Sequence, residues 1–293
     1  MLQTLLNGLV QGLLFAVIGV AFSLVYSTSR VFYLALGSTF TVAPYVFIAS
    51  AHAGLPWWLA IGATLLVAAA LGLAAEHFIH WPLDRSRAPG EIHLIASLGA
   101  FLVVGQVVVL IWGSDAKVLR AGVDTVYQLG ALRATQGQAL AVFVSVAILA
   151  ALAGWFRWSD VGLQIRAMAS NAPLLATLGR DVRALRRGAF ALSGVLAAAA
   201  ALLAARDLGF DPNVGMRAVL VGVAATIVGG RGSFVGAAVT GLVFGVLRAQ
   251  VVWHSSARWE DAATFAVLAL ILLVIPTGLS GALRGRTRIE DTP

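Results

Sequence analysis

The sequence contains no cysteine, a single lysine and few charged residues of either sign. Asp, Glu, Lys and Arg make up only 11% of its 293 residues, whereas soluble domains carry about a quarter. The absence of cysteine excludes a disulfide framework, a thiolate zinc site and a cysteine nucleophile. No linker rich in Pro, Gly or Ser divides the chain, so we expect one domain over residues 1–293.

Long uncharged apolar runs take the place of the missing charge. Hydrophobic residues account for 60% of the chain, and residues 1–29, 137–156, 188–205 and 262–283 carry no charge at all. Runs of roughly 18 or more apolar residues are typical of helices that span a bilayer. The predicted fold class is therefore an all-α polytopic membrane protein, surrounded by lipid.

Nine segments are candidates for membrane helices, and we expect eight or nine of them to span or partly span the bilayer. The segment at 218–230 is short for about 30 Å of hydrocarbon, and Gly37 and Pro44 interrupt the one at 31–51. Either is a candidate for a broken or re-entrant piece. The first segment lacks a basic leader and a clean cleavage site, which indicates a retained helix. The segments are 5–27, 31–51, 56–80, 92–113, 137–156, 187–205, 218–230, 233–253 and 260–281.

Arginines predict which side of the membrane each loop faces. Six lie between residues 157 and 187, and three more, Arg284, Arg286 and Arg288, lie in the C-terminal tail. Cytoplasmic loops carry an excess of basic residues, so we place both regions and the loop 81–91 inside. The net charge of +7 thus reflects topology, and no nucleic-acid partner is expected. The loops 114–136, 206–217 and 254–259 then face outside, and nine crossings put the N-terminus outside as well.

The outer loop 114–136 contains two short runs of β-prone residues, at 117–119 and 125–129. Such runs separated by turn residues are typical of a hairpin. We therefore predict a small hairpin in this loop.

The stretch 226-TIVGGRGSFVGAAVTG-241 is rich in glycine and invites comparison with a phosphate-binding loop. The Walker loop needs a Lys followed by Ser or Thr, and the dinucleotide fingerprint needs G-x-G-x-x-G after a strand. Neither pattern is present, so no nucleotide cofactor is expected. We interpret Gly229 and Gly230 as a break in a membrane helix.

Glycines spaced four apart follow this break and also occur in the first segment. Small residues at this spacing let membrane helices approach closely. Helix packing alone and the gating of a pathway are both open interpretations of the break. The pairs are Gly232 with Gly236, Gly241 with Gly245, and Gly8 with Gly12.

Residues 158–186 are predicted to form a cytoplasmic loop with two short helices. Arg166 and Asn171 interrupt its apolar residues, and Pro173 limits helix continuity. The second helix is expected from about Pro173 to Leu178, with Gly179 as its C-terminal cap.

One face of the first short helix is predicted to be apolar, since Ile165, Met168 and Ala169 share it. A cytoplasmic loop with an apolar face and few charges suits docking on another protein. The alternative is a helix that lies on the surface without a partner.

Polar groups within the membrane segments are candidates for lining a pathway. Each is also suited to capping or bridging helices. The residues that we single out are Gln11, Tyr33, Gly37, Ser38 and Thr226.

Other ionisable residues are interpreted structurally. We expect Glu76 to lie near the inner interface and pair with Arg85 or Arg87. Arg248 is expected to extend to the outer interface. His77 and His80 are interpreted, with Phe78 and Trp81, as an interfacial anchor instead of a metal site. The sequence shows no metal-binding pattern, Ser-His-Asp arrangement or paired carboxylates, so we expect no metal site and no catalysis.

Six runs of the sequence match a known family of membrane proteins, and they keep their order over nearly the whole length. They are 7-NGLVQGLLFAVIGVAFSLVYS-27, 76-EHFIHWPLDRS-86, 94-LIASLGAF-101, 162-GLQIRAMASNAPLLATLG-179, 215-GMRAVLVGVAATIVGGRGSFVGAAVTG-241 and 274-VIPTGLSG-281. In these runs the chain resembles the inner-membrane permease subunits of branched-chain amino-acid ABC importers, a group that also contains urea and short-amide permeases.

This resemblance implies a non-catalytic subunit of a bacterial inner membrane that works by alternating access. Its implied partners are ABC ATPase subunits, a second related permease subunit and an extracytoplasmic solute-binding protein. The loop 158–186 would dock on the ATPase, and its matching residues are Gly162, Arg166, Ala167, Asn171, Ala176 and Gly179.

One departure from the family pattern concerns the second segment. Members carry Asn-Phe-Ala-His-Gly there, but this chain has 33-YLALG-37, with Tyr33 and Leu36 at the Asn and His positions. The departure leaves the solute open between a branched-chain amino acid and urea or a short amide.

Three other function classes are weighed against the importer. A secondary transporter driven by ions usually needs an intramembrane carboxylate, for which only Glu76 is a candidate. A membrane-embedded enzyme lacks a catalytic cluster. A scaffold without transport is the third alternative.

Overall fold

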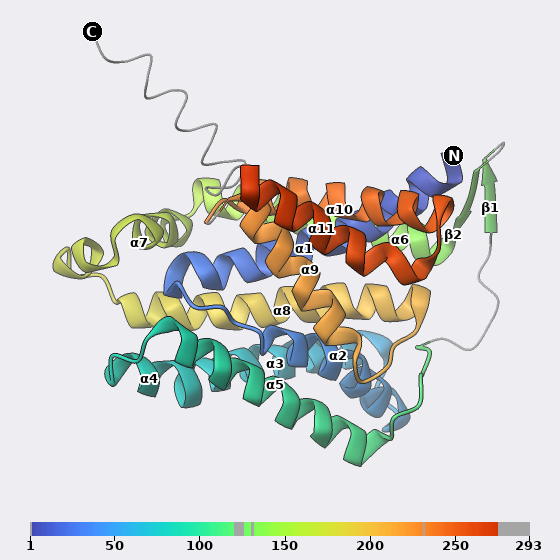
Figure 1. Ribbon diagram of the computed structural model, residues 1–293. Helices are drawn as coiled ribbons and strands as arrows, with labels where there is room; N and C mark the ends of the chain where they lie inside the picture. The colour runs from blue at the N-terminus through green and yellow to red at the C-terminus, as the bar shows by residue number, and fades with distance from the viewer. Residues whose placement is uncertain (1, 120–125, 130–131, 231, 275–293) are drawn as a thin grey trace, which may run out of the picture.

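The computed structural model of the protein describes residues 2–119, 126–129, 132–230 and 232–274. These residues form a helical bundle, with α7 at one end and a two-stranded hairpin beside the N-terminus at the other (Figure 1). The elements are α1 (Leu2–Ser29), α2 (Leu36–His52), α3 (Trp57–Ala75), the π-helical turn η1 (Glu76–His80), α4 (Trp81–Arg85), α5 (Gly90–Trp112), β1 (Val126–Leu129), β2 (Leu132–Thr135), α6 (Gln136–Trp158), α7 (Asp160–Thr177), α8 (Val182–Leu208), α9 (Val214–Gly229), α10 (Phe234–His254), the 3₁₀ turn η2 (Ala257–Trp259) and α11 (Glu260–Val274).

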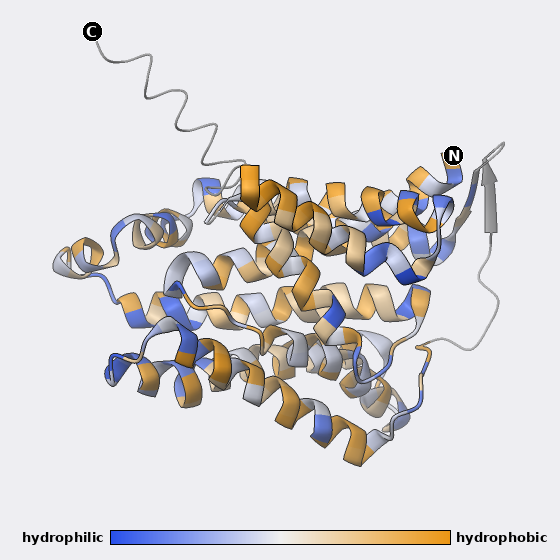
Figure 2. Ribbon diagram, in the orientation of Figure 1, coloured by the Kyte–Doolittle hydropathy of each residue, from blue (hydrophilic) through white to orange (hydrophobic). Residues whose placement is uncertain are grey.

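Six of the described helices are long and apolar enough to cross a membrane: α1, α3 with its continuation to Arg85, α5, α6, α8 and α10. Hydrophobic residues dominate the middle of the bundle, and hydrophilic ones gather toward its two ends (Figure 2). The helices α2, α9 and α11 have 17, 16 and 15 described residues. The expectation of eight or nine spanning or partly spanning helices therefore stays a prediction. The predicted end of the last segment at 281 and the three tail arginines lie outside the described residues.

The second predicted segment differs from expectation in where its helix is interrupted. Residues 31–35 are not helical, and Arg30 before them has a left-handed φ of 57°. The helix α2 then runs without a break through Pro44. The predicted interruption at Pro44 is wrong, because a buried membrane helix tolerates proline where neighbouring groups satisfy the freed carbonyl.

The helices α1 and α10 are packed backbone against backbone. A Cβ atom added to Gly12 would lie 2.7 Å from the carbonyl oxygen of Leu242, and one added to Gly245 would overlap the backbone of Gly12. Gly8 and Gly241 lie on the same seam, against the backbones of Val246 and Ala16. The predicted close approach at Gly8–Gly12 and Gly241–Gly245 is confirmed, because only hydrogen fits at these positions.

The described helices fall into two groups with matching contacts and opposite directions. In the first group α2 packs against α3 and α5, and in the second α9 packs against α10 and α11. The helix α1 precedes the first group and contacts α9 and α10 of the second. In the same way, α8 precedes the second group and contacts α2 and α3 of the first. Because α1 begins at the hairpin end and α8 at the α7 end (Figure 1), the groups form an inverted repeat.

The loop 114–136 contains the predicted hairpin, one run later than expected. The strands β1 and β2 pair antiparallel, with Val126 opposite Thr135. Thr135 then caps α6 through a capping box with Gln138. The run at 117–119 is not a hairpin strand, because the N–H and C=O groups of Lys117 pair with those of Phe210, each at 2.8 Å.

Candidate functional site

The helix α7 forms the predicted loop and has the predicted change of direction. Its backbone leaves helical geometry at Asn171, with φ −154° and ψ 91°. The side-chain Oδ1 of Asn171 accepts a hydrogen bond from Leu174 N at 3.1 Å, which starts a second turn of helix. Gly179 ends that helix with φ 77°, where its N–H donates to the carbonyl of Ala176. The sequence thus places the kink and the end of the second helix correctly, whereas α8 already begins at Val182, inside the predicted loop 158–186.

The apolar face of α7 points in the opposite sense from the one predicted. Ile165 and Met168 are buried in the core of the bundle, as is Leu175. The predicted docking face is therefore wrong for Ile165 and Met168, because the bundle itself covers them, whereas Ala169 is half-buried. The exposed large apolar side chains of α7 and of the residue that caps it are Val161 (43%), Leu163 (58%), Leu174 (58%) and Leu178 (71%).

The residues of this loop that resemble the family pattern separate into two groups. A Cβ atom on Gly162 would meet the backbone of Phe156, so this glycine packs α7 against α6. The others share an exposed position at the end of the bundle and are Arg166, Ala167, Asn171, Ala176 and Gly179.

The glycine stretch forms a sharp turn between α9 and α10. The helix α9 ends at Gly229. The next two glycines, Gly230 and Gly232, have positive φ angles of 99° and 85°. Ser233 then caps α10. Gly229 and Gly236 face each other with no room for a side chain between their backbones. Helix packing explains both glycines, and a role in gating stays a prediction. Arg231, between the two turn glycines, lies outside the described residues.

The predicted packing pair of Gly232 and Gly236 is wrong. Gly232 precedes the first turn of α10, and the one atom near its Cβ position is the Cβ of Ser27, at 3.8 Å. Glycine is needed at this position for its backbone conformation, since side chains other than hydrogen disfavour positive φ. Equal spacing in sequence thus corresponds to two different physical roles.

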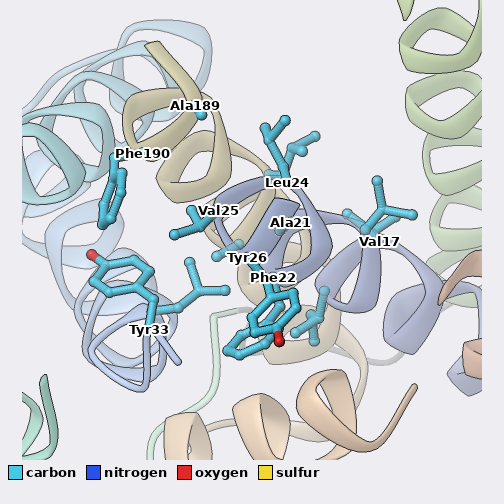
Figure 3. Close-up of a cluster of buried hydrophobic side chains, with 14 of the residues drawn as sticks. Val17, Ala21, Phe22, Leu24, Val25, Tyr26, Tyr33, Ala189 and Phe190 are labelled. Carbon is cyan, nitrogen blue, oxygen red and sulfur yellow. The ribbon is translucent and has the colours of Figure 1, made fainter. Parts of the chain in front are cut away.

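The polar groups singled out for a pathway are mostly enclosed within the chain. Tyr33 is 1% exposed and packs against Phe190 and His80, with ring centroids 4.9 and 5.6 Å away (Figure 3). Thr226 donates to the carbonyls of Gly19 and Gly222 at 3.0 and 2.9 Å, and so joins α9 to α1.

Gly37, Ser38 and Gln11 complete this set. Gly37 touches the backbone of Gly215 where α2 meets α9. The hydroxyl of Ser38 donates to the carbonyl of Ala35 at 2.7 Å. Gln11 lines a cavity of about 400 Å³ at the hairpin end of the bundle.

A chain of ionisable groups crosses the α7 end of the bundle. Glu76, only 3% exposed, pairs with Arg186 Nε at 2.8 Å, and Arg186 also pairs with Asp84. Asp84 reaches His93 Nε2 at 3.2 Å, and His93 Nδ1 lies 3.2 Å from His80 Nδ1. The predicted pairing of Glu76 with Arg85 or Arg87 is wrong, because α8 presents Arg186 to the inner face of η1. Buried carboxylates need such a partner.

Two further sequence interpretations are corrected. His80 is buried against His93 and anchors no interface. Arg248 does not reach solvent, since it is 5% exposed and pairs with Glu260 and Asp261 at 2.7 Å each. Its partners begin the next helix, and their spacing from Arg248 gave no periodic signal. Within the described ranges no three His, Cys, Asp or Glu side chains group as metal ligands would.

The chain was then compared with known protein families. Residues 4–275 match the family described as branched-chain amino acid transport system / permease component. The chain belongs to this family. The match covers both halves of the inverted repeat, and α7 between them lies within it.

Full-length relatives carry the same description. LivH of Escherichia coli (strain K12) and BraD of Pseudomonas aeruginosa are each named a high-affinity branched-chain amino acid transport system permease protein. Each is 28% identical to this chain over 96% of it and 95% of the relative. A probable branched-chain amino acid transport permease protein LivH of Methanocaldococcus jannaschii is 25% identical over 92% and 89%.

A solved structure has a similar fold. It is described as PsaBC from Streptococcus pneumoniae in complex with Fab, and its matching chain is 15% identical to this one. The TM-score is 0.53, over 95% of this permease and 94% of that chain. The similarity therefore extends to the arrangement of the helices over nearly the whole bundle.

Proposed function

We propose that the chain moves branched-chain or other aliphatic amino acids across the plasma membrane of a bacterium as the permease subunit of an ABC importer. The match to the family model over residues 4–275 carries this proposal. Relatives named for branched-chain amino acid transport, matched over almost their full length, support it. ATP would be hydrolysed by separate ATPase subunits, and a solute-binding protein and a second related permease chain would complete the complex.

The helix α7 is proposed as the contact with the ATPase. It projects from one end of the bundle (Figure 1) and presents Leu163, Leu174 and Leu178 to solvent beside Arg166. Exposed apolar side chains next to charge are typical of surfaces that bind another protein. The buried face of α7 holds it to the core, so a push on α7 is transmitted to the bundle.

We propose that a movement of α7 is transmitted through α1 to the turn between α9 and α10. Arg30, which follows the last residue of α1, donates from Nη2 to the carbonyl of Ala169 in α7 at 2.7 Å. The turn residue Gly232 lies beside Ser27, near the same end of α1. Glycine turns are suited to act as hinges between two states, because glycine can absorb large changes in φ and ψ.

The outer cavity supports an amino acid as the solute. Its lining includes groups of both signs. Arg217 pairs with Asp211 and Arg248 pairs with Glu260, whereas Lys117 has no carboxylate within ion-pair distance among the described residues. A zwitterion matches such a lining better than a neutral amide does, since charged groups of both signs surround it. A volume of about 400 Å³ is within the range of small-molecule sites.

The proposal is tested by uptake and by capture of the ATPase. In the native host, the intact chain should take up leucine in preference to urea, and uptake should stop when ATP is depleted but persist with a proton ionophore present and ATP maintained. Uptake that follows the ion gradient instead of ATP would contradict the importer, and a preference for urea would contradict the proposed solute.

The contact on α7 is tested with a matched pair of variants. The double variant Leu174→Ser/Leu178→Ser should lose ATPase capture by roughly 30-fold, since removing about 2 kcal/mol of apolar burial has that effect on binding. The control is Leu55→Ser, which changes an exposed leucine (41%) at the opposite end of the bundle. Equal capture by the double variant and the control would show that the ATPase binds elsewhere.

A further inference from the structure

The α7 end of the bundle holds a second, larger cavity that the transport proposal does not use. It has a volume of about 950 Å³ and lies between α1, α6, α7 and α10. Most of its wall is aliphatic, contributed by side chains of the spanning helices α6 and α10 such as Val146, Leu149 and Val239. Val146 and Val239 of this wall are about half exposed, at 48% and 52%. The cavity is therefore open between two helices that are long and apolar enough to span the membrane.

The charged part of this cavity is entirely basic. Arg30, Arg157 and Arg166 line it, and none of its lining residues is an Asp or Glu. Among the described residues, none of the three arginines has a carboxylate within ion-pair distance. Three guanidinium groups without counter-charges attract an anion, and their planar donor sets match phosphate oxygens.

The protein fixes one of these arginines in an uncommon conformation. Arg30 has a φ of 57°, a left-handed value that non-glycine residues rarely adopt. Its Nη2 atom is held by the carbonyl of Ala169, at 2.7 Å, so the guanidinium spans from α1 to α7. Ser233 and the first turn of α10 also line the cavity, where the positive end of the helix dipole adds to the attraction for an anion.

The three arginines come from segments that meet at the predicted cytoplasmic end, next to α7, while the aliphatic wall extends along α6 and α10 into the membrane. A ligand that fits both parts has an anionic head and an aliphatic tail. We propose that this cavity binds the phosphate headgroup of an anionic phospholipid of the cytoplasmic leaflet, with part of an acyl chain along α6 and α10. Basic pockets between spanning helices on the cytoplasmic side suit such headgroups.

Lipid binding at this site would make the region where α7 meets the turn after α9 sensitive to the lipid composition of the membrane. Gly232 and Ser233 line the same cavity as Arg166 and Ser170 of α7. A lipid held there touches both α7, which is the proposed ATPase-binding element, and the turn between α9 and α10, which is the proposed hinge. The binding itself depends only on the orientation of the bundle in the membrane, so it stands or falls separately from the transported solute.

The test uses the full chain, purified in a mild detergent and washed free of native lipid. Phosphatidylglycerol and phosphatidylcholine with identical acyl chains are titrated separately, and bound lipid is counted by native mass spectrometry. We expect the first lipid to be retained at least 10-fold more tightly. Arg30→Gln/Arg157→Gln should weaken its binding by roughly 10- to 30-fold, at about a factor of five per arginine.

Matched controls separate charge from fold and lipid from free phosphate. Arg85→Gln removes an exposed arginine that lies outside the cavity, in the predicted cytoplasmic loop. This variant should bind phosphatidylglycerol like the wild type. The single variant Arg157→Gln, with an unchanged helix signal by circular dichroism, keeps the test valid if the double variant does not fold. Inorganic phosphate at millimolar concentration should not displace the lipid.

Three results would overturn the proposal. The first is equal retention of the two lipids by the wild type. The second is displacement by inorganic phosphate, which would assign the arginines to a soluble anion. The third is normal lipid binding by the arginine variants with loss of ATPase capture, which would assign them to the partner protein.

Discussion

The ion-pair chain around Arg186 makes an asymmetric prediction about stability. Arg186, 13% exposed, is the shared partner of two carboxylates, Glu76 at 3% exposure and Asp84 at 32%. Replacing it with methionine leaves both without their cation, and removing one member of a buried ion pair costs roughly 3–5 kcal/mol. Glu76→Gln leaves Arg186 paired with Asp84 and keeps a group that accepts its hydrogen bond, so we expect a cost of only about 1 kcal/mol.

The double variant separates the interaction from the separate effects of the two substitutions. In Glu76→Gln/Arg186→Met a neutral amide replaces the most deeply buried carboxylate, so no buried charge is left without its partner at that position. We therefore expect it to be more stable than Arg186→Met alone by roughly 1–3 kcal/mol, which is the usual size of coupling between contacting groups. Two residues that act independently would instead give additive losses.

The assay is reversible unfolding of the detergent-solubilised chain by sodium dodecyl sulfate, followed by the helix signal in circular dichroism. Wild type, both single variants and the double variant are compared at equal detergent composition. The reasoning is refuted if Arg186→Met is no more destabilising than Glu76→Gln, or if the double variant is less stable than Arg186→Met alone. Both results would mean that water, and not Arg186, solvates Glu76.

Two further predictions concern glycines with matched controls. Gly245→Ala should destabilise the fold by roughly 2–4 kcal/mol in the same assay, because the added Cβ overlaps the backbone of Gly12. The control Gly99→Ala in α5 places its Cβ in open space and should be neutral or stabilising. Equal effects of the two substitutions would contradict the close packing of α1 against α10. Gly232→Ala and Gly54→Ala place a side chain at similar positive φ angles of 85° and 82°, so both should cost about 1–2 kcal/mol. Leucine uptake should fall only in Gly232→Ala if the turn after α9 is a hinge, and equal uptake by the two variants would contradict that role.

The sequence predicts well those features that depend on residues close together in the chain. The end of α7 at Gly179 and the end of α9 at Gly229 are examples, since a glycine in a suitable local pattern specifies a helix end. The membrane character of the bundle follows from uncharged runs in the same direct way. Such features need no knowledge of what packs against them.

Features that depend on distant partners were predicted less well. Glu76 and Arg186 are 110 positions apart, and nothing in the local spacing distinguishes Arg186 from the nearer Arg85. The face of α7 that holds Ile165 and Met168 has the apolar pattern of a docking surface and of a core surface alike. The bundle decides between them, because burial of that face against α1, α6 and α8 is a property of the whole fold.

The enclosed position of α1 has a consequence for how the protein is made. It leaves the ribosome before α8 and α10, yet the glycine seam on one of its faces is closed by α10 and another face by α8. More than half of the chain must be synthesised after Ser29 before α8 begins at Val182. During that interval the seam of α1 has only lipid or the insertion machinery beside it. Chains that stop before α8 should therefore be removed by membrane quality control, even though α1, α3, α5 and α6 in them are apolar enough to insert.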